Sequence, residues 1–291
     1  MTDPIRTGLG GTQHEFVDLH THSTASDGSR APAEVVRAAR AAGLAAVALT
    51  DHDTLAGLPE ARSTGSAIGI RVIAGVELSA VEVDLETHIL GLHLSELSEL
   101  EHRLVALREM RVNRAARIVE KLNQLGIAVT FEAVLKESAG GAVGRPHVAR
   151  ALIAGGWVVD FREAFERYLG NAKPAFVAKD HLPLGEAINL IHRAAGAAIL
   201  AHPGHLCTRE RIAPLVALGL DGLEVLHPSH SWEDSQRLDA IAAEFNLVRS
   251  GGSDWHGAPD GARALGMMRV PSQWLVDQEA RIAARGSRRV A

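Results

Sequence analysis

Histidine and aspartate stand side by side, or one residue apart, at several points in this sequence. Residues 18–22 read Asp-Leu-His-Thr-His, residues 51–53 read Asp-His-Asp, and Asp254 is followed by Trp255 and His256. Side chains at i and i+2 of a strand point to the same side, so the two histidines of the first segment can act on one ion. Imidazole and carboxylate groups together bind divalent transition metals. The spacing therefore indicates metal chemistry.

Most of these residues follow predicted strands, at the point where each strand ends. The carboxyl ends of parallel strands meet at one rim, where functional groups gather. Glu77 is predicted to follow the strand that ends at Val76, and His88 lies beyond it. The candidate ligands are His20, His22, Asp27, His52, Glu77, His88, His202, Asp254 and His256.

Each candidate also has an ordinary structural explanation when it is considered alone. His88 or His202 could be a hydrogen-bonded core histidine, Asp27 a turn residue and Asp51 a helix cap. Considered together, these explanations would require several functionally unrelated residues to lie at the same rim by chance. A shared metal site is the simpler hypothesis.

An alternation of strands and helices has to position these side chains. Residues 15–20 predict a strand, a helix with Pro32 in its first turn is expected to run to about Ala42, and the apolar run 44–50 predicts a second, buried strand. The same alternation is expected in the strand 69–76, the helix 186–195, the strand 197–201, the helix 209–217, the strand 222–226, the helix 235–245 and the strand 247–250. This pattern is typical of an α/β fold.

Residues 95–170 interrupt the alternation. They are rich in Glu, Arg, Ala and Leu, with helical spacing of Leu104, Leu107, Met110, Ile118, Leu122 and Leu125. We expect an all-helical insert whose apolar residues form its own core. The predicted organisation is a discontinuous barrel, residues 15–94 and 171–285, with a helical substrate-capping insert at residues 95–170.

Composition excludes several classes of protein. The chain of 291 residues has a formal net charge of -5, so tight non-specific binding to long nucleic acid is not expected. Cys207 is the single cysteine, which excludes an intrachain disulfide and a thiolate zinc site. Residues 1–13 lack the apolar core of a signal peptide, and no apolar run is long enough to span a bilayer. We expect a cytoplasmic protein with no membrane partner.

The ordered motifs resemble those of the polymerase and histidinol phosphatase (PHP) family. The matching segments are His20-Thr21-His22, Ser26-Asp27-Gly28, Thr50-Asp51-His52-Asp53, Gly75-Val76-Glu77, His88, Ala201-His202-Pro203-Gly204 and Ser253-Asp254-Trp255-His256. The resemblance covers nearly the whole chain outside the insert. It implies an α/β fold, a distorted barrel of about seven βα units, with the active site at the carboxyl-terminal rim.

The resemblance also implies how the ligands divide among two or three divalent cations. One cation takes His20, His22, Glu77 and Asp254, a second takes Glu77, His88 and His202, and a third takes Asp27, His52 and His256. Glu77 then bridges two ions. The carboxylates favour Mn²⁺, with Zn²⁺ or Fe²⁺ as alternatives. Asp18 and Asp53 are expected to orient ligand imidazoles, with capping or turn roles as the alternative.

Within the family, the chain is most similar to small bacterial phosphoesterases that remove the 3′-phosphate of nucleoside 3′,5′-bisphosphates and, in some members, degrade short RNA from the 5′ end. The matching features are the insert, Gly144-Arg145-Pro146-His147 and Lys173-Pro174. Arg145, His147 and Lys173 are expected to contact a substrate phosphate, although Arg145 could instead pair with a carboxylate and Lys173 could be solvated. His205 has no assigned role.

The expected reaction is hydrolysis of a phosphomonoester by a hydroxide that bridges the metals, with no protein nucleophile. Ser253 lacks the Gly-x-Ser-x-Gly context of a catalytic serine. A metal-bound water or an unidentified histidine would protonate the leaving group. The rival hypotheses are a histidinol-phosphate phosphatase and a non-catalytic metal-binding accessory domain. A glycine-rich phosphate-binding loop is absent from the sequence.

Overall fold

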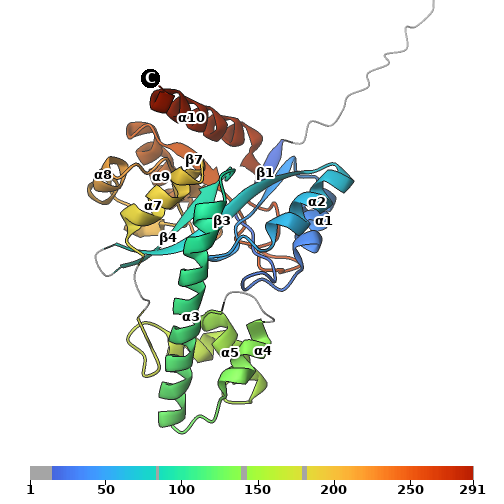
Figure 1. Ribbon diagram of the computed structural model, residues 1–291, viewed down its shortest axis with the longest axis vertical. Coiled ribbons are helices and arrows are strands. Elements are labelled where there is room, and N and C mark those ends of the chain that lie inside the picture. The colour runs from blue at the N-terminus through green and yellow to red at the C-terminus, as the bar shows by residue number, and fades with distance from the viewer. Residues whose placement is uncertain (1–14, 83–84, 139–142, 179–181, 291) are drawn as a thin grey trace, which may run out of the picture.

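A computed structural model describes residues 15–82, 85–138, 143–178 and 182–290, and for residues 286–290 it describes the backbone only (Figure 1). The described strands form one eight-stranded sheet with the order β7-β6-β5-β4-β3-β2-β1-β8. The strands are β1 (Phe16–Asp18), β2 (Ala46–Leu49), β3 (Arg71–Glu82), β4 (Leu85–Leu92), β5 (Ala197–Leu200), β6 (Gly222–Leu226), β7 (Val248–Gly251) and β8 (Val270–Pro271). The expectation for residues 1–13 lies outside the described residues.

The sheet curves into a nearly closed barrel. β1, β2 and β3 are parallel, as are β5, β6 and β7. The barrel closes between β1 and β7, where the N–H of Leu19, just after β1, donates to the Gly251 carbonyl of β7 at 3.1 Å. The expected α/β barrel is confirmed, and the short apolar strands of its wall are buried as predicted for strands covered on both faces.

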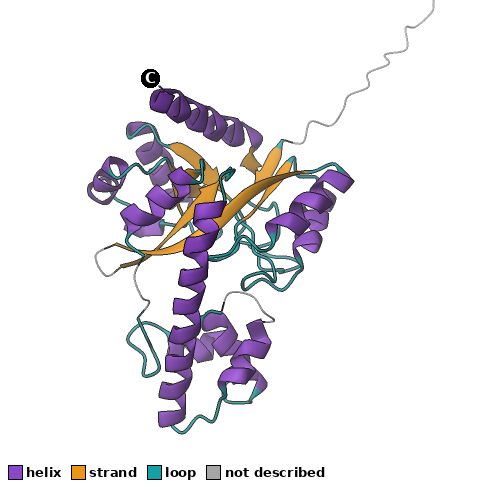
Figure 2. Ribbon diagram, viewed as in Figure 1, coloured by secondary structure: helices purple, strands orange, loops and turns teal. Residues whose placement is uncertain are grey.

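Helices cover the outside of the barrel (Figure 2). The described helices are α1 (Pro32–Ala41), α2 (Leu58–Ile68), α3 (Ser98–Gln124), α4 (Phe131–Ser138), α5 (Arg145–Ala154), α6 (Phe161–Ala164), η1 (Phe165–Leu169), α7 (Leu184–Arg193), η2 (Gly204–Leu206), α8 (Arg209–Ala217), α9 (Trp232–Glu244) and α10 (Ser272–Val290). α1 and α2 pack on β2 and β3, α7 on β3 to β5, α9 on β6 and β7, and α10 on β1, β5, β7 and β8.

One strand pair departs from the predicted alternation. β3 does not end at Val76 but continues to Glu82, and β4 returns antiparallel to it, with Glu77 opposite Leu90 and Ser79 opposite His88. The prediction that Glu77 follows a strand is therefore wrong, since it lies within β3. The physical reason is that Leu78 and Ala80 are buried and continue the strand's alternation past the rim of the barrel.

The long helix α3 belongs to two hydrophobic clusters. Leu104 and Leu107 pack into the cluster of the barrel, whereas Ile118 and Leu122 pack with α4, α5 and η1 in a separate cluster. In Figure 1, α3 leaves the barrel and extends alongside α4 and α5. The expectation that all its apolar residues form the insert's own core is wrong for Leu104, Leu107 and Met110, because the first half of the helix covers the barrel, and for Leu125, which is 48% exposed.

A membrane-spanning segment was not expected, and none of the described helices is both long and apolar enough to cross a bilayer.

The closure of the barrel yields a first prediction. A Cβ at position 252 would lie 2.5 Å from the backbone nitrogen of His20, too close for real atoms, so Gly252→Ala has to displace the chain at the closing seam. We expect a loss of about 1–3 kcal/mol in the free energy of unfolding, measured with urea. Gly185→Ala in α7 is the matched control, because the atom nearest to the added Cβ, on the side chain of Leu218, would be 3.4 Å away. Equal stability of the two variants would contradict close packing at the seam.

Candidate metal centre

Five imidazoles surround the carboxylate of Glu77, which is 1% exposed inside the carboxyl-terminal rim. Oε1 lies 2.7 Å from His88 Nδ1 and 3.0 Å from His202 Nε2. Oε2 lies 3.2 Å from His22 Nε2, 3.2 Å from His52 Nδ1 and 3.3 Å from His20 Nε2. The two oxygens thus face different sets of histidines, which is the geometry that a bridging carboxylate requires.

The β3–β4 register explains how Glu77 meets His88. Glu77 pairs with Leu90 and Ser79 with His88, so Glu77 and His88 are diagonal neighbours on one face of the hairpin. Of the other histidines, His20 and His22 lie beyond β1, His52 beyond β2 and His202 beyond β5, and all of them reach the carboxylate of Glu77. The antiparallel pair of β3 and β4 therefore adds Glu77 and His88 to the histidines that follow the ends of parallel strands.

Asp254 and Asp27 mark two further parts of the centre. Asp254 Oδ1 lies 3.2 Å from His22 Nε2 and 3.5 Å from His20 Nε2. Asp27 Oδ1 lies 3.2 Å from His256 Nε2, and Asp27 Oδ2 lies 3.9 Å from His52 Nε2. All the candidate ligands of the sequence analysis thus come together at one rim. The distances do not reproduce the expected division in full, since His22 also joins the Asp27 group and His52 also groups with Glu77 and His88.

The donor atoms fit divalent metal ions. Four groups among the described residues have all their ligand atoms within 4.8 Å of one another: His20, His22 and Asp254; His52, Glu77 and His88; His22, Asp27, His52 and His256; and His20, Glu224 and His227. Within the described part of the chain, the buried nitrogens His22 Nδ1 and His52 Nδ1 have no hydrogen-bond partner. Buried polar atoms are normally satisfied, so these two point to groups that a bound ion would complete.

Burial and charge act in opposite directions on these groups. Burial raises the pKa of the Glu77 carboxyl, but His52, His88 and His20 outweigh it and hold the pKa well below its usual range. For His22, burial lowers the pKa, yet contacts with Asp254 and Glu77 raise it to about 10. Burial prevails at His52, whose pKa falls to about 3. In the absence of a cation, the carboxylates therefore stay ionised and some of the imidazoles hold protons.

Asp18 and Asp53 fix the loops that carry the candidate ligands. Asp18 accepts hydrogen bonds from the backbone N–H of Ser253 at 3.0 Å and of Gly266 at 2.9 Å, next to Asp254. Asp53 accepts from the backbone N–H of Ser79 at 3.0 Å and pairs with Arg111 of α3. These contacts favour the alternative role, in which both carboxylates hold backbone rather than imidazole.

The backbone is strained at several positions in the centre. Asp53, His202 and Asp254 have φ values of 50°, 29° and 50°, in the left-handed region that non-glycine residues rarely adopt. Two of the three are candidate ligands. The surrounding hydrogen bonds must hold these conformations against their intrinsic cost.

Sequence reasoning missed several residues of the centre. Glu224 and His227 are buried beside His20, and Arg111 and Arg150 reach it from the helices of the insert, Arg150 by donating to the carbonyl of Asp27 at 2.7 Å. Glu224 did leave a signal, because it is the one charged residue in the predicted strand 222–226. The arginines left none, since the insert contains many exposed arginines of the same kind.

The expected substrate contacts are not found together. Arg145 lines a pocket of about 270 Å³ next to His88 and His202, where it lies 3.4 Å from Glu86. His147 is 1% exposed, and its Nδ1 accepts the N–H of Gly144. Lys173 is exposed, and none of its described contacts joins it to the centre. The ring of His147 is packed inside the protein, and its expected substrate contact stays a prediction.

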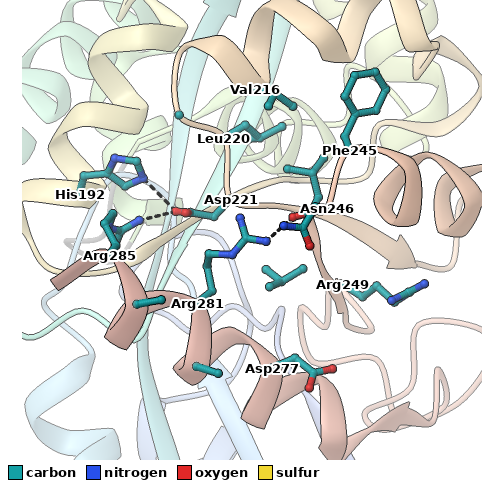
Figure 3. A pocket seen from close by; sticks show the side chains of 15 residues that line it. His192, Val216, Leu220, Asp221, Phe245, Asn246, Arg249, Asp277, Arg281 and Arg285 are labelled. Atoms are coloured by element: carbon teal, nitrogen blue, oxygen red, sulfur yellow. Dashed lines mark hydrogen bonds and ion pairs between the residues drawn. The ribbon is translucent and has the colours of Figure 1, made fainter. Parts of the chain in front are cut away.

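A cavity of about 730 Å³ lies away from this centre. It is lined by residues of α10 and by residues around the starts of β6 and β7, at the opposite ends of those strands. Figure 3 shows its polar groups bonded to one another, with His192 and Arg285 on Asp221 and Arg281 on Asn246. The cavity therefore offers few unused polar groups to a ligand.

A family model described as PHP domain matches residues 18–198. A 5′-3′ exoribonuclease of Haemophilus influenzae is 39% identical over 245 residues, covering 82% of this chain and 89% of that protein. A 3′,5′-nucleoside bisphosphate phosphatase of Chromobacterium violaceum is 36% identical over 257 residues, covering 86% of this chain and 90% of that protein. The crystal structure of a presumed metal-dependent phosphoesterase from Bifidobacterium adolescentis superposes with a TM-score of 0.84 at 33% identity, covering 91% of this chain and 96% of that chain.

The raised pKa values predict that cation binding releases protons. The pKa of His22 is raised to about 10 and that of His20 lies well above its usual value, so both rings are protonated at neutral pH until a cation displaces the proton. The affinity for Mn²⁺ should therefore rise with pH between about 6 and 8.5, by about tenfold per unit for each proton displaced. Calorimetry in buffers of different ionisation enthalpy counts these protons. Binding without proton release would contradict the prediction.

Proposed function

Because the chain belongs to the PHP domain family and is a metal-dependent phosphoesterase, we propose that it removes the 3′-phosphate from nucleoside 3′,5′-bisphosphates. The observation that carries the proposal is the buried carboxylate of Glu77, with two oxygens shared among five imidazoles. The relative from Chromobacterium violaceum, which is named for this substrate, supports the choice of phosphomonoester.

The proposed ligand set is the one that the family resemblance implies. We assign His20, His22 and Asp254 to one cation, His88 and His202 to a second, with Glu77 shared between them, and Asp27, His52 and His256 to a third. The mixture of imidazole and carboxylate favours Mn²⁺ over Zn²⁺ or Fe²⁺. When bound, divalent cations activate water and neutralise charge on the phosphoryl oxygens.

Ser253 and Cys207, two residues that could compete as nucleophiles, are both buried. Ser253 is fully buried and its backbone N–H bonds to Asp18, so its hydroxyl cannot reach a substrate in the rim. Cys207 is also buried, and burial raises the pKa of its thiol to about 11, which keeps it protonated. Both observations support hydrolysis without a protein nucleophile.

The pocket beside His88 and His202 is the proposed place for the remainder of the substrate. It brings the guanidinium groups of Arg145 and Arg211 to the edge of the centre. Arg145 pairs with Glu86 at 3.4 Å, and this partly exposed pair can open when a second phosphate competes for the guanidinium. We propose that Arg145 binds the phosphate that is not cleaved.

Other expectations remain proposals. The Haemophilus influenzae relative is an exoribonuclease, which supports short RNA with a 5′ end as a further substrate. We also propose a cytoplasmic location, a capping role over the rim for the helical insert of residues 95–170, and a substrate contact for Lys173. Histidinol phosphate remains the rival substrate, and a non-catalytic accessory domain remains the rival role.

The first test of this function is an assay with purified, chelator-treated protein. We expect no hydrolysis without added metal, recovery with Mn²⁺, and a higher kcat/KM for a nucleoside 3′,5′-bisphosphate than for histidinol phosphate, because only the bisphosphate has a second phosphate for Arg145. The measurements are phosphate release from both phosphomonoesters and mononucleotide release from a short 5′-phosphorylated RNA. Full activity after removal of the metal, or preference for histidinol phosphate, would overturn the proposal.

A second test isolates the role of Arg145. Arg145→Ala should lower kcat/KM about 10- to 100-fold for the bisphosphate and leave an aryl phosphate nearly unchanged, because one charge-assisted contact is lost only with the doubly phosphorylated substrate. Arg167→Ala is the matched control, since this exposed arginine of η1 pairs with Glu163 outside the pocket. Equal losses for both substrates would assign Arg145 to the fold or to the reacting phosphate.

A further inference from the structure

Glu224 of β6 connects two of the loops that carry candidate ligands. It is fully buried, and its Oε1 lies 2.9 Å from His20 Nδ1. Its Oε2 accepts the backbone N–H of His202 at 2.7 Å. Both oxygens therefore have a partner, one on the chain after β1 and one on the chain after β5.

The contact with His20 determines which ring nitrogen faces the centre. A carboxylate accepts hydrogen bonds, so Nδ1 must donate the bond to Glu224 and therefore carries a proton. The lone pair is then on Nε2, the atom that lies 3.3 Å from Glu77 Oε2 and 3.5 Å from Asp254 Oδ1. Glu224 thereby selects the tautomer in which His20 presents Nε2 to a cation.

The contact with His202 acts on the backbone instead. His202 has a φ of 29°, a conformation that L residues rarely adopt and that costs free energy. The hydrogen bond from its N–H to the buried Glu224 holds the turn, and the ring then reaches Glu77 Oε1 at 3.0 Å. One carboxylate thus fixes a side chain and a strained backbone at the same time.

A different reading would make His20, Glu224 and His227 a metal site of their own, since their ligand atoms lie close together. The contacts of His227 argue against it. Its Nδ1 accepts the backbone N–H of Ser229 at 3.1 Å, so in the neutral ring the proton is on Nε2. That nitrogen lies 3.4 Å from Asp254 Oδ2, and while it carries the proton it has no lone pair to offer an ion.

We propose that Glu224 is a positioning residue of the metal centre, which sets the tautomer of His20 and holds the loop of His202. The proposal rests on the metal-dependent function proposed above. It adds to the candidate ligands a residue that acts on two of them without being a ligand itself.

The experiment compares Glu224→Gln with Asp221→Asn in the full-length protein. Asp221 is the matched control, because it is also buried and precedes β6, where it lies 2.8 Å from His192 at the opposite end of the strand. We expect Glu224→Gln to weaken Mn²⁺ binding about 10- to 100-fold, with the wild-type number of ions at saturation, and Asp221→Asn to bind as the wild type does. Calorimetry and metal analysis give affinity and stoichiometry.

A spectroscopic measurement on the wild type tests the same proposal without a variant. In Zn²⁺-loaded protein with ¹⁵N-labelled histidine, His20 should be protonated at Nδ1 and bound through Nε2. Binding through Nδ1 would overturn the proposal, as would unchanged Mn²⁺ affinity in Glu224→Gln. A variant that lost one ion while keeping the others at wild-type affinity would make Glu224 a ligand, which also overturns it. None of these readouts involves turnover, so a protein that binds metal as expected but hydrolyses no phosphoester would refute only the proposed function.

Discussion

The burial of one carboxylate among five imidazoles is the constraint on which the rest of the structure depends. Glu77 is removed from water, and an isolated buried charge would be expensive. The imidazoles that offset this cost arrive from four separate segments of the chain, so the strands must end at matching heights around the barrel. The β3–β4 hairpin supplies Glu77 and His88 from one rigid unit, and the other histidines are brought to it.

Buried carboxylates that are not themselves candidate ligands hold the loops of this centre in place. Asp18 holds the loop before Asp254, and Asp51 accepts hydrogen bonds from Ser23 and Ser26 in the loop that leads to Asp27. Glu224 acts on His20 and His202 from behind. Each of these carboxylates uses its oxygens on fixed donors, which leaves the loops few alternative conformations. The strained φ values at His202 and Asp254 are tolerated for this reason.

The helical insert is coupled to the chemistry through two arginines. Arg111 of α3 pairs with Asp53 and donates to Ser79 at 2.9 Å, and Arg150 of α5 donates to the carbonyl of Asp27. The first half of α3 shares the core of the barrel, so one helix belongs to both the barrel and the insert. Under the proposed function, bound cations would supply the chemistry and Arg145 of the insert would bind the substrate beside them.

The sequence by itself determined the barrel class, most elements of both parallel blocks and the residues that gather at the rim, because strand alternation and the order of short motifs are local properties of the chain. It did not predict helix α2, between β2 and β3. Only the tertiary structure decided that Glu77 lies within a strand, because the pairing of β3 with β4 depends on a partner and not on local pattern. It also showed that His147 is packed away from the pocket and that Glu224, His227 and Arg111 stand behind the candidate ligands. Such contacts join residues far apart in the chain, and no spacing in one sequence records them.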